Sequence, residues 1–183
     1  MRIRAVFKPS DFQPTPDASR ADAEALFEQM FPGVENPEIP RDHAGMAIVA
    51  LNPGLARHMS AMSRFMALEL DFSKRRDLRE LAIQTCHLKA GCGYGFESRI
   101  SAAGAAGISP AQLAALAVWK SSSLFDEEQR LVIEYAEAVH DNAVTDELFQ
   151  RMVERFGEKG AIECAAIVGY WTCWAMIINA AKP

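Results

Sequence analysis

The chain has 183 residues, of which half are hydrophobic and 23% are charged, and its formal net charge is −5. This length allows one domain with a substantial core, and the composition is ordinary for a soluble globular protein. Acidic and basic residues are mixed along the chain without a basic block or tail, so we expect no nucleic-acid binding. Residues 1–16 lack the apolar core of a secretory signal, and four cysteines are too few for a disulfide scaffold. We therefore expect a reduced, cytoplasmic protein.

The first part of the chain predicts an extended arm followed by a helix. Three prolines lie within residues 1–18, and a helical pattern covers residues 20–31 before the breaker pair Pro32-Gly33. A short buried helix is predicted within residues 43–51. We assign residues 1–41 to an N-terminal arm with its first helix and residues 42–183 to the main domain.

The next two helices are predicted from their end signals. Asn52 and Pro53 are suited to the N-cap and first position of a helix reaching about residue 70. Ser73 is predicted to cap a helix that extends to Ala90, with Gly91 just beyond its C-terminus.

The second half of the chain carries further helix signals. A helix beginning near Tyr94 is predicted to end at Gly107. The remaining helices are predicted to begin at capping residues or glycine, at Ser109, Asp126, Thr145 and near Gly160. About eight helices with short connections and no strand predict an all-α fold.

The last helix includes eighteen residues, 164–181, without a formal charge. This length is at the lower limit for a membrane span. Thr172 and Asn179 lie within it, and Lys182 alone supplies a flanking basic anchor. We therefore expect no membrane insertion, and predict that this helix forms the centre of a soluble bundle or a subunit interface.

Residues 80–109 contain the most informative motif. Glu80 lies twelve residues before Cys92, which opens a helix rich in small residues. This arrangement resembles the core motif of the carboxymuconolactone decarboxylase and AhpD-like alkylhydroperoxidase family, which reads Glu, then Cys-x-x-Cys, then His. Gly95 stands at the second cysteine of that motif and Arg99 stands at the histidine. The resemblance covers roughly residues 42–181.

The resemblance implies an AhpD-like helical bundle that forms homo-oligomers, trimers or hexamers, through apolar helices. It also implies a small-molecule substrate bound near subunit contacts. We expect no cofactor. We also expect no metal, because the spacing of Cys86, His87 and Cys92 matches no zinc pattern.

Acid–base chemistry has three candidate contributors in this motif. Glu80 lies beside the apolar stripe of its helix, where desolvation favours a general acid or base, although a solvated surface glutamate is the alternative. His87 can supply the proton transfer that Arg99 cannot. Arg99 and Tyr94 are candidate substrate contacts, and an ion pair between Glu80 and Arg99 is equally compatible with the sequence.

Cys92 is the candidate nucleophile. Its position at a helix N-terminus favours the thiolate, while a buried structural cysteine is the alternative. In the family the second cysteine attacks peroxide, so Gly95 removes the two-cysteine cycle. Cys86 could replace the missing partner only if a turn at Gly91 brought the two thiols together.

The sequence leaves three candidate functions open. The first is decarboxylase- or lyase-type acid–base chemistry on a small anionic substrate through Glu80, His87 and Arg99. The second is a peroxiredoxin-type thiol peroxidase that uses Cys92. The third is a non-catalytic binding or assembly protein, because two motif residues are replaced.

Overall fold

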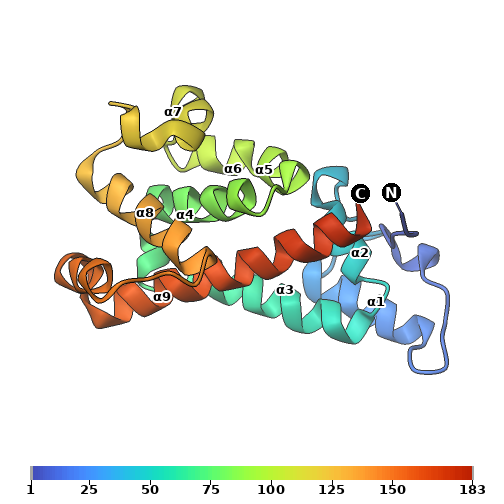
Figure 1. Cartoon of the computed structure of the whole chain (residues 1–183). Coiled ribbons are helices and arrows are strands. Elements are labelled where there is room, and N and C mark those ends of the chain that lie inside the picture. Colours follow the sequence, from blue (N-terminus) through green and yellow to red (C-terminus); the bar gives the residue numbers. More distant parts are fainter. Residues whose placement is uncertain (1, 183) are drawn as a thin grey trace. The chain divides into compact units, whose positions relative to one another are not determined.

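The computed structural model describes residues 2–182, and these residues form an all-α protein (Figure 1). Nine α-helices and four short 3-10 helices occur in this range, and the only β-type pairing there is an isolated bridge between Thr15 and Ala18. The predicted fold class, a bundle of about eight helices, is therefore confirmed.

The chain divides into two compact units, and the first comprises residues 2–65 and 177–182. It contains α1 (Arg20–Met30), α2 (Ala44–Val49) and most of α3 (Pro53–Leu68). The N-terminal arm is built into this unit, because the Val6 N–H donates to the Ala47 carbonyl at 2.8 Å and the Ile39 N–H donates to the Phe7 carbonyl at 2.8 Å. Asn52 caps α3 as predicted, since its Oδ1 accepts the Leu55 N–H at 3.0 Å.

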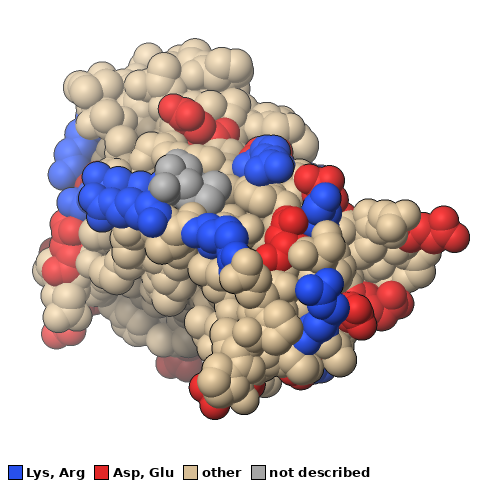
Figure 2. Space-filling model, turned by 90° about the vertical axis from the view of Figure 1, so that its right-hand side faces the viewer, with Lys and Arg blue, Asp and Glu red and all other residues tan. Residues whose placement is uncertain are grey.

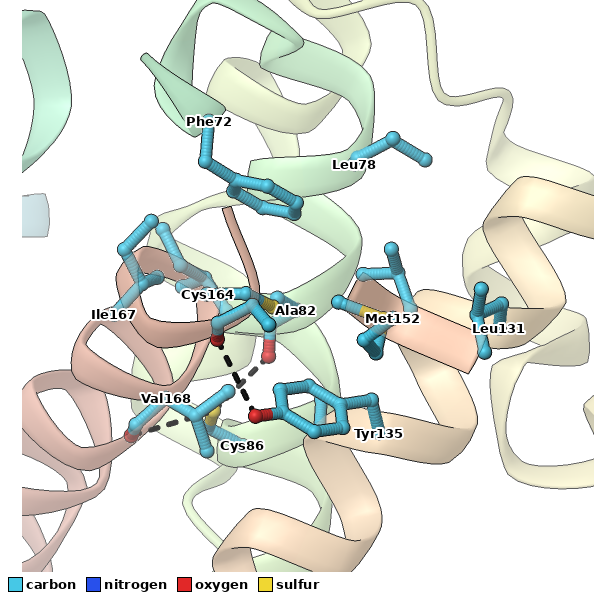
Figure 3. Packing of buried hydrophobic residues seen from close by; sticks show 14 of the residues in the cluster. Phe72, Leu78, Ala82, Cys86, Leu131, Tyr135, Met152, Cys164, Ile167 and Val168 are labelled. Atoms are coloured by element: carbon cyan, nitrogen blue, oxygen red, sulfur yellow. Dashed lines mark hydrogen bonds between the residues drawn. The ribbon is translucent and has the colours of Figure 1, made fainter. Parts of the chain in front are cut away.

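The second unit, residues 66–176, is built around α4 (Arg76–Lys89). One face of α4 packs against α8 (Glu127–His140) and α9 (Asp146–Ala181), in the core drawn in Figure 3. Another face contributes Leu81 to a second core with Leu116, Trp119 and Ile133. Because apolar neighbours cover it on more than one face, α4 buries polar residues as well as its apolar stripe.

Three shorter helices complete the second unit. They are α5 (Gly93–Ser98), α6 (Ile100–Ala105) and α7 (Pro110–Ala115). The capping boxes predicted at Ser109 and Asp126 are present, each with its side chain accepting the backbone N–H three residues on. The single helix predicted from Tyr94 to Gly107 is instead two helices that meet at Arg99.

The predicted cap at Ser73 is wrong. Ser73 lies in a 3-10 turn, Phe72–Lys74, and its hydroxyl donates to the Met66 carbonyl at 2.5 Å. The helix therefore begins later, at Arg76, and its N-cap residue Arg75 makes no capping side-chain hydrogen bond. A nearby carboxylate completes the turn, because Glu163 Oε2 accepts the Phe72 N–H at 2.7 Å.

The last helix, α9, is interrupted where the sequence predicts an end, at Gly157, whose φ is +72°. Its apolar part is long enough to cross a membrane, and half of that part is buried within the protein. The core helix of a soluble protein has the same properties, so this helix is weak evidence for a membrane span.

Candidate functional site

The end of α4 and the turn after it bring the motif together. Gly91 adopts the left-handed conformation, with φ +59°, as the predicted C-terminal residue requires. The Gly91 N–H donates to the Leu88 carbonyl at 3.1 Å and the Cys92 N–H donates to the His87 carbonyl at 2.8 Å. This pair of bonds is a Schellman motif, and it folds Cys92 back onto the last turn of α4.

Glu80 is fully buried and is bound by two arginines. Arg99 Nη2 lies 2.7 Å from Glu80 Oε1 and Arg99 Nε lies 3.0 Å from Oε2, which is a bidentate pair. Arg79 Nη2 lies 3.0 Å from Oε1. The ion pair that the sequence left as an alternative is therefore present, and a second guanidinium reinforces it.

Glu80, Arg79 and Arg99 form a polar cluster with excess positive charge, because two guanidiniums face one carboxylate. Arg99 is its most accessible member: 26% of its side chain is exposed, against 11% for Arg79 and none for Glu80. The Arg99 guanidinium also lies 5.5 Å from the ring centroid of Trp171, a cation–π distance. Arg99 therefore has a fixed orientation, and part of its side chain is open to solvent.

His87 fills the space beside Gly95. A Cβ on Gly95 would lie 2.9 Å from His87 Nε2 and 3.0 Å from Cys92 Sγ, so the imidazole, the thiol and the glycine meet at one point. His87 is 2% exposed, and its Nδ1 is a buried atom without a hydrogen-bond partner. Burial, and secondarily the positive charge of Arg99, lowers the pKa of His87 to about 4. The imidazole is therefore neutral at neutral pH.

The surroundings of Cys92 favour the second of the two sequence interpretations, a buried structural cysteine. Cys92 is the N-cap of α5, but that helix has only six residues and the thiol is buried. Burial raises the pKa of Cys92, and a hydrogen bond from the Gly95 backbone offsets only part of this effect. The thiol form is therefore favoured, in agreement with the alternative of a buried structural cysteine.

Cys86 does not pair with Cys92. All four cysteines are free, and Cys86 Sγ donates to the Ala82 carbonyl at 3.0 Å within the core of Figure 3. Burial raises the pKa of Cys86 to about 12. A redox partnership of these two thiols has no support in this arrangement.

Gln84 is the other buried polar group of α4. Its Nε2 donates to the Phe96 carbonyl at 3.2 Å, which ties α4 to α5, and its Oε1 has no hydrogen-bond partner. Gln84 and His87 thus each retain one buried polar atom without a hydrogen-bond partner, on neighbouring turns of the helix, and such atoms are few in native proteins.

Sequence reasoning missed Arg79. Neighbouring residues of a helix normally point apart, so position 79 carries no signal for contact with Glu80. The long side chain nevertheless turns back, and its Nη1 also donates to the Ala67 carbonyl at 2.6 Å. Tyr94, the other predicted substrate contact, lies half-buried on the first turn of α5 and stays a prediction.

Two open hollows of the molecule lie away from the motif. One, of about 360 Å³, is bordered by Lys120, Glu134 and Arg151, and the other, of about 630 Å³, lies in the first unit. Neither is lined by Glu80, Cys92 or Arg99. Within residues 2–182, no three His, Cys, Asp or Glu side chains are grouped to hold a metal ion.

Comparisons with known proteins give one short match. The chain is 40% identical over 60 residues to a protein of Escherichia coli strain K12 described as "Uncharacterized protein YnjA". The match covers 32% of this chain and 33% of that protein. No family model matches the chain, and no solved structure does.

Proposed function

We propose that this protein is a carboxymuconolactone decarboxylase-like enzyme that carries out acid–base chemistry on a small anionic substrate. The observation that carries the proposal is a neutral, buried imidazole two turns along α4 from Glu80, within the electrostatic influence of Arg99, whose side chain is partly open to solvent. Arg99 binds the substrate anion, and His87 accepts a proton from it. Glu80 is a positioning residue, because both of its oxygens are occupied by arginines.

The charges of the cluster fit proton abstraction next to a carboxylate or lactone carbonyl. Removal of that proton leaves negative charge on the substrate, which the surplus positive charge of Arg79 and Arg99 stabilises. A neutral imidazole can accept the proton directly, whereas an imidazolium cannot. Burial of Glu80 and His87 strengthens these electrostatic effects because it excludes water.

A homo-oligomer is part of this proposal. On the second-unit part of α9, one helical face exposes only uncharged residues: Ile162, Ala166, Gly169, Cys173 and Met176. Their spacing alternates between four and three, which aligns them along the helix. Ile162 is 60% and Met176 is 64% exposed in the single chain. We assign this face to contacts between copies in a trimer or hexamer.

The test measures the turnover of 4-carboxymuconolactone and related small unsaturated carboxylates. The two readouts are the loss of the carboxylate group and the exchange of substrate protons for deuterium. His87→Gln should abolish turnover and leave substrate binding in place. Arg99→Lys should raise KM more than it lowers kcat, because it removes the bidentate fork. His58→Gln, an exposed histidine of the first unit, is the matched control and should change neither value.

A non-catalytic binding protein is the second candidate, favoured by the burial of Glu80, His87 and Cys92. Binding of these carboxylates without turnover by the parent protein would favour it. The thiol peroxidase is tested in parallel with cumene hydroperoxide and a dithiol reductant. Peroxide consumption that disappears in Cys92→Ser would replace the acid–base proposal.

A further inference from the structure

One side of α3 carries large apolar side chains that remain exposed. The exposed fractions are 48% for Leu55, 45% for Met62, 44% for Phe65 and 68% for Leu68, and the buried positions of the helix are apolar as well. Charged side chains are spread among uncharged ones on the face of the molecule shown in Figure 2, whereas these four neighbours are all apolar. A helix that is apolar on both sides is normally enclosed by protein, so this side of α3 has the character of an interaction surface.

The exposed face of α9, from Ile162 to Met176, has a complementary shape. Large side chains stand at its two ends, and its central exposed positions are Ala166, Gly169 and Cys173. A Cβ on Gly169 would meet nothing within 4 Å, so the helix surface is bare there. Small residues between large ones form a groove, into which the large side chains of another helix can pack. The exposed side of α3 and the α9 face have nearly the same length, about 20 Å each.

Each of the two surfaces has an exposed charge near one end. Arg64 lies in the C-terminal half of α3, and Glu158 lies one turn before Ile162 on α9. Neither has an ion-pair partner among residues 2–182. An antiparallel approach of α3 to the α9 face brings these opposite charges to the same end of the contact. Because α3 contains no acidic residue, pairing of α3 with α3 of a second copy offers Arg64 no counter-charge.

We propose that the exposed side of α3 in one molecule packs antiparallel against the α9 face of a second copy. Two different surfaces meet in this contact, so its repetition links copies head to tail and closes into a ring when the rotation between copies allows it. One ring of three, or two such rings, gives the trimer or hexamer proposed above. The inference rests on the assignment of the α9 face to contacts between copies, and it is independent of the acid–base chemistry.

Cys173 makes the contact testable by oxidative cross-linking of the full-length protein, because the other three cysteines are buried. In the antiparallel contact Cys173 lies near the N-terminal end of α3. Leu55→Cys should therefore form a disulfide between copies, seen as covalent dimers and trimers on a non-reducing gel. Leu68→Cys, about 20 Å away on the same side of α3, should not cross-link. The Leu55→Cys/Cys173→Ser double variant is the control and should also stay free of cross-links.

Sedimentation of the full-length protein tests the charge pair. Arg64→Glu and Glu158→Arg should each raise the dissociation constant of the oligomer about fivefold, and the double variant should restore the parent value. Glu147→Arg, at an exposed glutamate in the part of α9 before Gly157, is the matched control and should change nothing. All these positions are exposed, so the variants should fold like the parent, which the unfolding midpoint checks. Unchanged association in both single variants would contradict the charge pair.

Other results would overturn the proposal itself. A monomeric parent protein excludes any contact between copies. Cross-linking of the parent through Cys173 alone indicates pairing of α9 with α9, and a Leu55→Cys cross-link that persists without Cys173 indicates pairing of α3 with α3. If Ile162→Glu produces a monomer but Leu55→Cys forms no cross-link, the α9 contact stands and α3 is rejected as its partner.

Discussion

The imidazole of His87 occupies the space that a side chain at position 95 would need: His87 Cδ2 lies 2.8 Å from where a Cβ on Gly95 would stand. The position at which the motif that this segment resembles has its second cysteine is thus occupied by the ring of a histidine from the preceding helix. The imidazole can occupy this position because residue 95 has no side chain, and the ring in turn fills the space that a side chain there would take.

We expect Gly95→Ala to lower the free energy of unfolding by about 1–3 kcal/mol, because an overpacked core must shift His87 or Cys92. The measurement is urea denaturation. Gly104→Ala in α6, where a Cβ meets nothing within 4 Å, is the control and should change stability by at most about 1 kcal/mol, in the stabilising direction. In a His87→Ala background the cost of Gly95→Ala should shrink; an undiminished cost there would contradict the explanation.

Glu80→Gln should destabilise the protein by about 3–5 kcal/mol, because it leaves two guanidiniums without their buried counter-charge. Glu134→Gln breaks an exposed pair with Arg151 and should cost under about 1 kcal/mol. Thermal and urea unfolding of both variants give the comparison. A loss at Glu80 no larger than that at Glu134 would show that the buried pair contributes little.

Some of the helix caps could be predicted from the sequence, and one could not. The caps at Asn52, Ser109 and Asp126 were predictable because capping depends on residues three positions apart. Ser73 has the same local chemistry, but its hydroxyl is bonded to the Met66 carbonyl. That contact depends on tertiary packing, which no local pattern contains.

The same distinction holds in the candidate site. The Glu80–Arg99 pair could be foreseen as one of two alternatives, from residue type and helix position. The state of Cys92 was likewise one of two alternatives, and the sequence could not decide between them, because helix position suggests a thiolate whereas burial under neighbouring segments raises the pKa of the thiol. The sequence could thus name candidate residues of the site. It could not give the degree of burial, which determines their chemistry.

The stability of the protein should rise with pH between about 4 and about 6.5 through His87. Its pKa in the folded protein is about 4, so in this range the unfolded chain binds the proton and the folded protein does not. The shift corresponds to about 3 kcal/mol, which is fully lost below pH 4. Urea unfolding of the parent and His87→Gln across this range gives the test: the slope should be smaller in the variant, and equal slopes would contradict the assignment.

The buried cysteines should resist alkylation. Burial raises the pKa values of Cys86 and Cys92, so both thiols are protonated and shielded at pH 8. Iodoacetamide should modify them only after unfolding in urea, as followed by peptide mass spectrometry. Rapid modification of Cys92 in the folded protein would instead point to a reactive thiol and revive the peroxidase interpretation.

The exposed face of α9 should govern self-association. Ile162→Glu and Met176→Glu place charges on that face and should shift sedimentation toward the monomer. Val118→Glu, at another exposed apolar residue of the second unit, should leave the oligomer intact. Cys173 lies on the same face and should be labelled more slowly at high protein concentration; monomeric behaviour of the parent protein would exclude the contact.

The Schellman turn at Gly91 has a consequence for how the protein folds. It allows Arg99 to reach Glu80 across only nineteen positions of chain, and every other polar residue of the candidate site lies within this interval or next to it. Short loops close quickly and at low entropic cost. We therefore expect the charged centre to assemble early, as a local hairpin of helices, before distant segments such as α9 enclose it.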